Sequence, residues 1–280
     1  MTHAAHAFVD VDELLYAVKE LSVAGRWDQA TRLLASVTVE ESAARARLTR
    51  AAAEVALDHD WFAGTDTAAE PIQAAEKEFP YGDWDTDFLR LRHTYARLLL
   101  VDGALRIGPD GKDPEALAAL RDRARDLHAG APDEVRRGWA AMYHGLITEN
   151  HFADRTAAAT HFTDALRAGE DGADGLLARE ALRHLGGQDH DTGDHERAGE
   201  RWRRATALGA GAGTVPGTLS QQLLLAVLAR DSGDEAGAVA LAAEIVRWAE
   251  AIGANRLAAQ ASAFLTGTDP TALPAATDTD

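Results

Sequence analysis

Apolar residues recur at helical spacing along almost the whole chain, and no stretch alternates apolar and polar residues as a half-buried strand would. Alanine, the strongest helix former, is abundant, whereas β-branched residues are sparse. A run of turn residues over 107–113 predicts a loop, and Pro114 suits the first position of the helix that follows. The pattern therefore predicts an all-α fold with no strand.

Three segments repeat a glycine followed five positions later by an alanine, each between two apolar helical runs. We expect each glycine to end one helix in the left-handed conformation. Asp194 and Asp234 directly follow their glycines and are expected to cap the next helix. The three segments are Gly25-Arg-Trp-Asp-Gln-Ala30, Gly193-Asp-His-Glu-Arg-Ala198 and Gly233-Asp-Glu-Ala-Gly-Ala238.

The repeat extends beyond these segments. A bulky residue follows the alanine by four positions and a small one by seven, as in Ala198, Trp202 and Ala205. We call the residue at the alanine position of each repeat its marker. The markers are Ala30, Ala68, Leu120, Ala158, Ala198 and Ala238.

This pattern resembles the tetratricopeptide-repeat (TPR) superfamily. It is most similar to uncharacterised TPR-like proteins of high-GC bacteria, which share blocks like Arg183-His-Leu-Gly186 and Val215-Pro-Gly-Thr218. The resemblance implies a TPR-like α-solenoid of about six helical hairpins. A last amphipathic run, Asn255 to Leu265, is expected to be a C-terminal capping helix. We predict one repeat domain over 1–266 and a disordered tail over 267–280, where apolar residues are few.

Charge and composition exclude several functions. The formal net charge of −17 argues against binding of nucleic acid and against attraction to an anionic membrane surface. There is no cysteine, so disulfides, thiolate metal sites and cysteine nucleophiles are excluded. No signal peptide and no membrane-spanning apolar run is recognisable, so a cytoplasmic location is expected.

The segment 189–196 is rich in histidine and carboxylates, which could coordinate a divalent metal. The candidate ligands are His190, Asp194 and His195. The alternative is a turn between helices, in which Gly193 ends one helix and Asp194 caps the next. We favour the turn and predict no metal and no cofactor.

Arginine and histidine residues also mark a candidate ligand groove. Arg90, His93 and Arg97 share one helix face because they are three and four positions apart. Guanidinium groups bind carboxylate or phosphate bidentately, so such a groove would suit an anionic ligand. The alternative is that these arginines pair with carboxylates of neighbouring hairpins. The full candidate set is Arg50, Arg90, His93, Arg97, His144, Glu180, Arg183 and His190.

Aromatic residues and catalytic motifs add little at this level. Trp27 lies in a turn and is expected to be exposed, whereas the other five tryptophans lie in apolar helical context and are expected in the core. His184 is expected to be packed. No nucleophile elbow, phosphate-binding loop or dinucleotide fingerprint is present.

These observations favour a non-enzymatic scaffold that holds a peptide or partner protein in its concave groove. The alternative is an enzyme or small-molecule binder whose pocket is enclosed by the superhelix and lined by arginine and histidine. Sensing of a metal through 189–196 ranks third. An open groove would favour the first, and an enclosed pocket with converging polar groups would favour the second.

Overall fold

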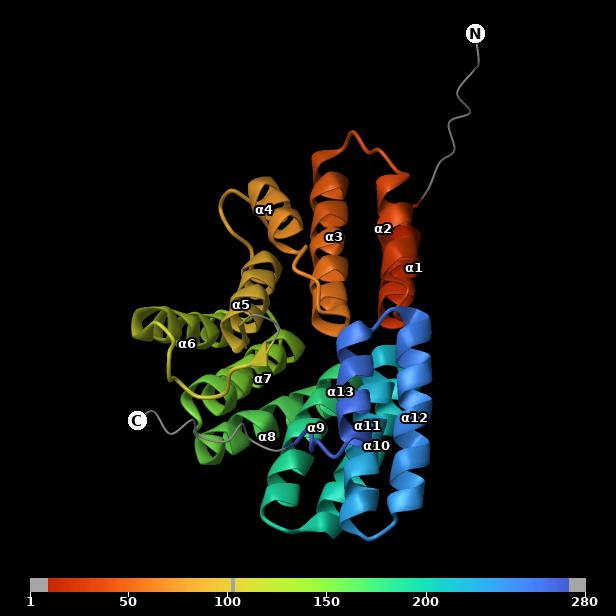
Figure 1. The fold of residues 1–280 in the computed structure, drawn as a ribbon. Coiled ribbons are helices and arrows are strands. Elements are labelled where there is room, and N and C mark those ends of the chain that lie inside the picture. Colours follow the sequence, from red (N-terminus) through yellow and green to blue (C-terminus); the bar gives the residue numbers. More distant parts are fainter. Residues whose placement is uncertain (1–9, 102–103, 272–280) are drawn as a thin grey trace.

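The structure, a computed structural model, describes residues 10–101 and 104–271, and helices dominate this part of the chain (Figure 1). Short turns join most successive helices, and each helix packs against its neighbours in the sequence. The thirteen helices are α1 (Val11–Val23), α2 (Trp27–Ala35), α3 (Ser42–Ala63), α4 (Ala69–Glu78), α5 (Trp84–Leu99), α6 (Pro114–Ala129), α7 (Glu134–Phe152), α8 (Arg155–Asp171), α9 (Gly175–Asp191), α10 (His195–Gly211), α11 (Val215–Asp231), α12 (Glu235–Ile252) and α13 (Asn255–Leu265).

One short strand pair departs from the prediction that the chain has no strand. β1 (Leu100–Val101) pairs antiparallel with β2 (Ala104–Leu105), with Leu100 opposite Leu105. Two residues in each strand are too few for the alternating pattern by which strands are recognised in a sequence. The prediction of an all-α fold otherwise holds for the described residues.

The predicted helix ends are confirmed where the repeat glycines occur. Gly25, Gly193 and Gly233 adopt φ values of 75°, 81° and 87°, a region that favours glycine. The carboxylates of Asp194 and Asp234 accept the backbone N–H three residues on, at 3.1 and 2.9 Å, and so cap α10 and α12. Local sequence thus determines where these helices end and begin.

The repeat markers all lie in or at the start of the even-numbered helices, and all are buried. Each even-numbered helix follows an odd-numbered one, which gives six successive helix pairs with α13 after the last. α6 begins at Pro114 and α13 spans the residues predicted for the capping helix. The exposed fractions are 0% for Ala30, Ala68, Ala158, Ala198 and Ala238 and 2% for Leu120.

The two ends of the helix succession contact each other, α1 with α11 and α3 with α13, so the succession of helix pairs closes into a ring (Figure 1). One apolar cluster joins Leu14 and Val18 of α1 to residues of α11, α12 and α13. The turn between α1 and α2 lies against α12, since a Cβ added to Gly25 would be 3.1 Å from the Ile252 side chain. At the end of α3, the Arg256 guanidinium donates a hydrogen bond of 2.7 Å to the Asp60 carbonyl.

Three tryptophans depart from the sequence prediction; one of them is Trp61, expected in the core but 38% exposed. Trp27 is only 4% exposed, because it belongs to the apolar cluster at the closure and stacks on His59 and Phe62. Trp248, expected in the core, is 49% exposed on α12, where its Nε1 donates to Glu244. α12 is the outer helix of the last pair, so this face has no further helix to pack against.

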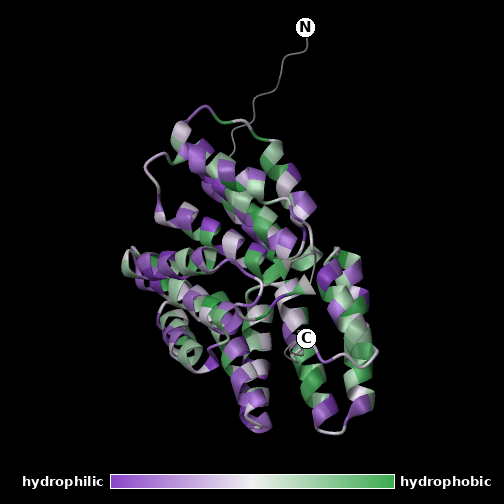
Figure 2. Ribbon diagram, turned by 60° about the vertical axis from the view of Figure 1, so that its left-hand side comes forward, coloured by the Kyte–Doolittle hydropathy of each residue, from purple (hydrophilic) through white to green (hydrophobic). Residues whose placement is uncertain are grey.

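Hydrophobic and hydrophilic residues are interspersed along most helices, as expected of amphipathic helices in a packed assembly (Figure 2). Among the described residues, no helix combines the length and the apolar character needed to cross a membrane. Of the predicted tail 267–280, residues 272–280 lie outside the described part of the chain. Residues 267–271 are placed in a turn, with the Thr271 amide donating to Asp269.

We predict that Arg256→Met weakens ring closure. Methionine keeps much of the aliphatic stem but cannot donate to the Asp60 carbonyl, and a hydrogen bond from a charged group is worth about 1.5–3 kcal/mol. Tm should fall, and amide hydrogen exchange should quicken in α1–α3 and α13 before it does in α7–α9. As a control, Arg247→Met removes an exposed pair with Glu244 on α12 and should change stability by less than about 0.5 kcal/mol. Equal exchange in all helices would show that Arg256 does not hold the ring ends together.

Candidate functional site

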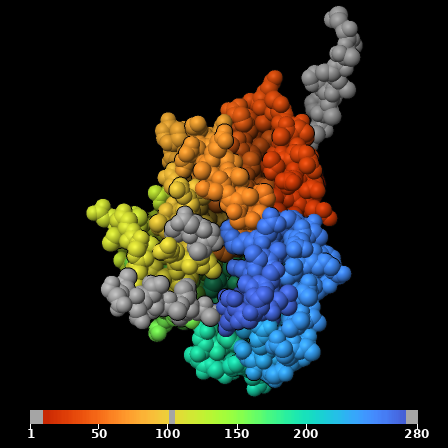
Figure 3. Space-filling view, in the orientation of Figure 1, coloured from red at the N-terminus to blue at the C-terminus, as the bar shows by residue number. Residues whose placement is uncertain are grey.

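The ring encloses a cavity of about 1610 Å³, lined chiefly by the odd-numbered helices. Figure 3 shows its opening as a hollow between α5 and α13, with the green middle of the chain visible at depth. The loop residues 107–110 and the turn residues Pro270 and Thr271 also line it. The odd-numbered helices thus form the inner wall and the even-numbered helices the outer layer.

Most arginines of the inner wall are held by carboxylates. Arg92 of α5 pairs with Asp58 of α3 at 2.8 Å. Arg179 pairs with Glu180 on α9, also at 2.8 Å. Arg50, one of the predicted groove residues, donates to Asp83 at 2.9 Å and so links α3 to the start of α5. These arginines are therefore struts within the wall, as the alternative interpretation of the sequence anticipated.

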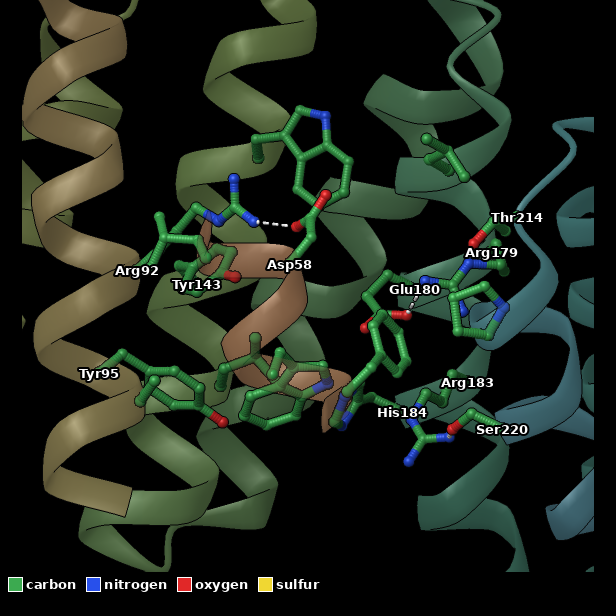
Figure 4. A pocket seen from close by; sticks show the side chains of 18 of the residues that line it. Asp58, Arg92, Tyr95, Tyr143, Arg179, Glu180, Arg183, His184, Thr214 and Ser220 are labelled. Carbon is green, nitrogen blue, oxygen red and sulfur yellow. Dashed lines mark hydrogen bonds and ion pairs between the residues drawn. The ribbon is translucent and has the colours of Figure 1, made fainter. Parts of the chain in front are cut away.

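Arg183 of α9 differs from these arginines. It donates a hydrogen bond of 3.2 Å to the Ser220 hydroxyl of α11, and among the described residues no carboxylate forms an ion pair with it. None of its nitrogens is both buried and unbonded, so its remaining N–H donors are accessible from the cavity that it lines. Burial lowers the pKa of Arg183. Figure 4 shows Arg183 beside Ser220, with Tyr95 on the other side of the cavity.

Glu54 of α3 is the acidic counterpart. It lines the cavity and has an exposed side chain. Among the described residues, its carboxylate forms no hydrogen bond and no ion pair. Its pKa is raised because surrounding protein displaces solvent, an effect that the charge of Arg92 partly opposes. Arg183 and Glu54 are thus a cation and an anion of the cavity wall that no ion pair neutralises; Lys19, Arg256, Glu20 and Asp110 also line the cavity without an ion pair among the described residues.

A histidine–carboxylate pair also lines the cavity. His184 Nδ1 lies 3.0 Å from Glu149 Oε2, and Gln188 Nε2 donates to the other Glu149 oxygen at 3.3 Å. Burial alone would raise the pKa of Glu149, but the hydrogen bond and charge of His184, with the charge of Arg155, lower it. The expectation that His184 is packed holds in part, because its ring stacks on Phe162. An imidazole oriented by a carboxylate can also accept or donate a proton.

Aromatic rings form a continuous strip on the opposite wall, from α5 to α7. We call Trp84, Phe88, Tyr95 and Tyr143 the aromatic strip; all four line the cavity. Trp84 stacks on Phe88 with centroids 4.9 Å apart, and Tyr143 meets Phe88 and Tyr95 edge-on at 5.2 and 5.6 Å. The sequence marks Trp84 only as a core residue, because an apolar stripe has the same spacing whether it faces a core or a cavity.

Of the predicted groove residues, the structure brings Arg50, Glu180 and Arg183 to the cavity wall. It does not bring the stripe of Arg90, His93 and Arg97 there. Arg90 instead pairs with a carboxylate of α4, and burial lowers the pKa of His93. The stripe lies on another face of α5, because the cavity takes the positions of the aromatic strip and of Arg92.

His144 and His190 also lie away from the cavity. His144 of α7 stacks on His161 of α8, with ring centroids 4.1 Å apart. Burial, followed by the charges of nearby histidines and arginines, lowers the pKa of His144 to about 4. His190, at the end of α9, points instead toward α11 and places its Nε2 2.7 Å from Asp231. The repeat pattern predicts which residues of a helix face inward with an error of one or two positions, so it does not separate His144 and His190 from true cavity residues.

The predicted metal candidates are only partly brought together. His190, His195 and Asp231 offer ligand atoms within 4.8 Å of one another, so this group could hold a metal ion. Asp231 comes from α11 and was not among the sequence candidates. Asp194 was, but its carboxylate caps α10. The His190–Asp231 hydrogen bond by itself accounts for the contact between these helices.

A scan against models of known protein families finds no match to this chain, and a search of curated proteins finds none either. The site therefore has to be interpreted from its own geometry.

We predict that the protein binds no stoichiometric Zn²⁺, because the group above is explained by a helix cap and a hydrogen bond. Metal analysis of protein purified without chelator should show well under one equivalent. One equivalent of zinc that disappears in both His190→Ala and His195→Ala would overturn this prediction.

We predict a loss of stability below neutral pH from two histidines. Burial is the main cause that lowers the pKa of His144 and of His151 to about 4 each, whereas an unfolded histidine has a pKa of about 6.5. From about pH 6.5 down to pH 4 the unfolded chain therefore binds protons that the folded protein does not, and stability falls. Melting temperatures at about pH 7 and pH 5 should differ less in His144→Gln than in the parent protein. An unchanged difference would contradict the assignment.

Proposed function

We propose that the chain is a TPR-like α-solenoid, closed into a ring, that binds a small organic molecule in its central cavity. The observation that carries the proposal is the central cavity of about 1610 Å³, which is partly open to solvent and on whose wall polar and aromatic side chains converge. Six helix pairs with buried markers at matching positions, followed by a last single helix, support the TPR-like architecture.

The closed ring favours the enclosed-ligand alternative over a peptide groove. An extended peptide needs an open concave surface along which successive hairpins can contact it. Here the contact of α1 and α3 with α11 and α13 joins the two ends of that surface. A compact ligand that contacts several inner helices at once suits this geometry better.

The size and polarity of the cavity also suit a small molecule. Small-molecule pockets usually measure about 300–1,000 Å³ and contain a few placed polar groups among apolar ones. The cavity is somewhat larger, which leaves space for ordered water beside the ligand. Its ion-paired arginines hold the wall rigid, while Arg183 and Glu54 keep bonding capacity for a ligand.

Gly187 of α9 provides a direct test of this proposal. It lines the cavity, and a Cβ added there would meet no atom within 4 Å. The Cβ of Gly187→Phe should meet no atom, and its ring should occupy the part of the cavity one helical turn from Arg183. Replacing a mid-helix glycine should leave stability unchanged or raise it by up to about 1 kcal/mol. We expect the variant to lose a small molecule that native mass spectrometry detects in the parent protein. It should also lose one-to-one binding of the neutral fluorescent probe N-phenyl-1-naphthylamine.

The matched control is Gly211→Phe at the exposed end of α10. This glycine also has open space around its Cβ position but does not line the cavity. It should bind the probe as the parent protein does. If Gly187→Phe folds and binds the probe unchanged, or if the parent protein binds no probe, the cavity is not a ligand site.

A further inference from the structure

We infer that the ligand of the cavity is an aryl anion: a flat aromatic body that lies against the aromatic strip and carries one anionic group bound by Arg183. This inference rests on the proposed function, since it specifies the ligand of the same cavity. It combines Arg183 with the aromatic strip, which neither the net charge nor the repeat pattern of the sequence relates to each other.

The anionic group is assigned from the state of Arg183. A guanidinium in a partly buried place normally has a carboxylate partner, because leaving its charge without one is costly. Its only hydrogen bond to a described residue goes to the neutral Ser220 hydroxyl. Glu180, on the same helix, is the nearest candidate partner but is held by Arg179 at 2.8 Å. The ligand would supply the missing anion, with two oxygens matching the fork of N–H donors.

The aromatic body is assigned from the opposite wall. The four rings of the aromatic strip meet in edge or stacked contacts. They pack on the core between α5 and α7, and each also contributes surface to the cavity wall. A planar ring gains stacking or edge-on contacts with such a surface in addition to the burial of apolar area. Figure 4 shows Tyr95 and Tyr143 of the strip on the side of the cavity opposite Arg183. The strip and Arg183 are therefore within reach of one ligand.

The surrounding charges favour Arg183 as the place for the anionic group, although Lys19 and Arg256 also line the cavity without an ion pair among the described residues. Most other cavity arginines are paired with carboxylates, and Arg256 donates to the Asp60 carbonyl. Glu54 adds a negative charge that no arginine neutralises in an ion pair. The chain as a whole carries a formal charge of −17, so an anion gains nothing from general attraction and needs this local site.

The experiment compares two fluorescent probes with the same aromatic rings. One is the sulfonate 8-anilinonaphthalene-1-sulfonate, and the other is its neutral counterpart N-phenyl-1-naphthylamine. Both are titrated into the parent protein, Arg183→Gln, Arg183→Lys and Gly187→Phe. Arg204→Gln serves as the control, because Arg204 is a half-exposed arginine that pairs with Glu170 on the outer layer.

We expect Arg183→Gln to weaken sulfonate binding about tenfold or more, since charge-assisted hydrogen bonds are lost, and to leave binding of the neutral probe within about twofold. Arg183→Lys should keep part of the sulfonate affinity, because it retains the charge but not the fork. Arg204→Gln should change neither probe. Circular dichroism and Tm of each variant establish that it is folded, and Arg183→Lys and Ser220→Ala provide readouts should Arg183→Gln fail to fold.

Two other outcomes separate this inference from the proposed function. If Gly187→Phe abolishes binding of both probes but Arg183→Gln weakens them equally or not at all, the cavity binds ligands and the aryl-anion inference is wrong. If Gly187→Phe changes neither probe, both are wrong. Sulfonate binding that Arg204→Gln weakens as much as Arg183→Gln does would also overturn the assignment to Arg183.

Discussion

The contact of α1 and α3 with α11 and α13 is the constraint on which the rest of the structure depends. Each helix pair of a repeat array buries its apolar face only against its neighbours, so an open array leaves two apolar ends to be covered. Here the two ends cover each other: α1 and α3 share one apolar cluster with α11, α12 and α13. The Arg256 hydrogen bond to Asp60 and its position over the Trp61 ring fix the angle at which they meet. Closure converts the concave faces of the odd-numbered helices into the wall of one cavity.

The arginines and carboxylates of the cavity wall need partners of opposite charge, and ion pairs between helices supply them. Arg92–Asp58 and Arg50–Asp83 each connect α3 and α5 while they line the cavity. Such pairs contribute little net stability when they are exposed, but breaking one in a partly enclosed wall leaves a charge without its partner. Arg183, whose hydrogen bond goes to a hydroxyl, is not part of these ion pairs, and for this reason the proposed ligand is assigned to it.

The fold was largely predictable because its determinants are local. Gly193 ends one helix and Asp194 caps the next through contacts with residues adjacent in the sequence. Pro114 begins α6 through its own backbone geometry, which is also a local property. The site was less predictable. Of the predicted groove residues, Arg183 lies on the cavity wall, whereas Arg90 and its stripe lie on another face of α5. The sequence places arginines on more than one face of α5, and only the packing of α4 and α7 decides which face borders the cavity.

Ring closure itself could not have been predicted, because it joins residues such as Asp60 and Arg256 that are 196 positions apart. No periodicity marks such a pair, and Trp27 was misjudged for the same reason. This distance has a thermodynamic consequence. The cavity exists only when the ends meet, so a ligand that binds the wall stabilises closure by mass action, by about 2.7 kcal/mol at a concentration one hundred times its Kd. That is comparable to the contribution of one charge-assisted hydrogen bond, such as the one from Arg256 to Asp60 where the chain ends meet. Under the proposed function, closure and ligand binding are therefore coupled, and the contact between the chain ends need not be strong in the absence of ligand.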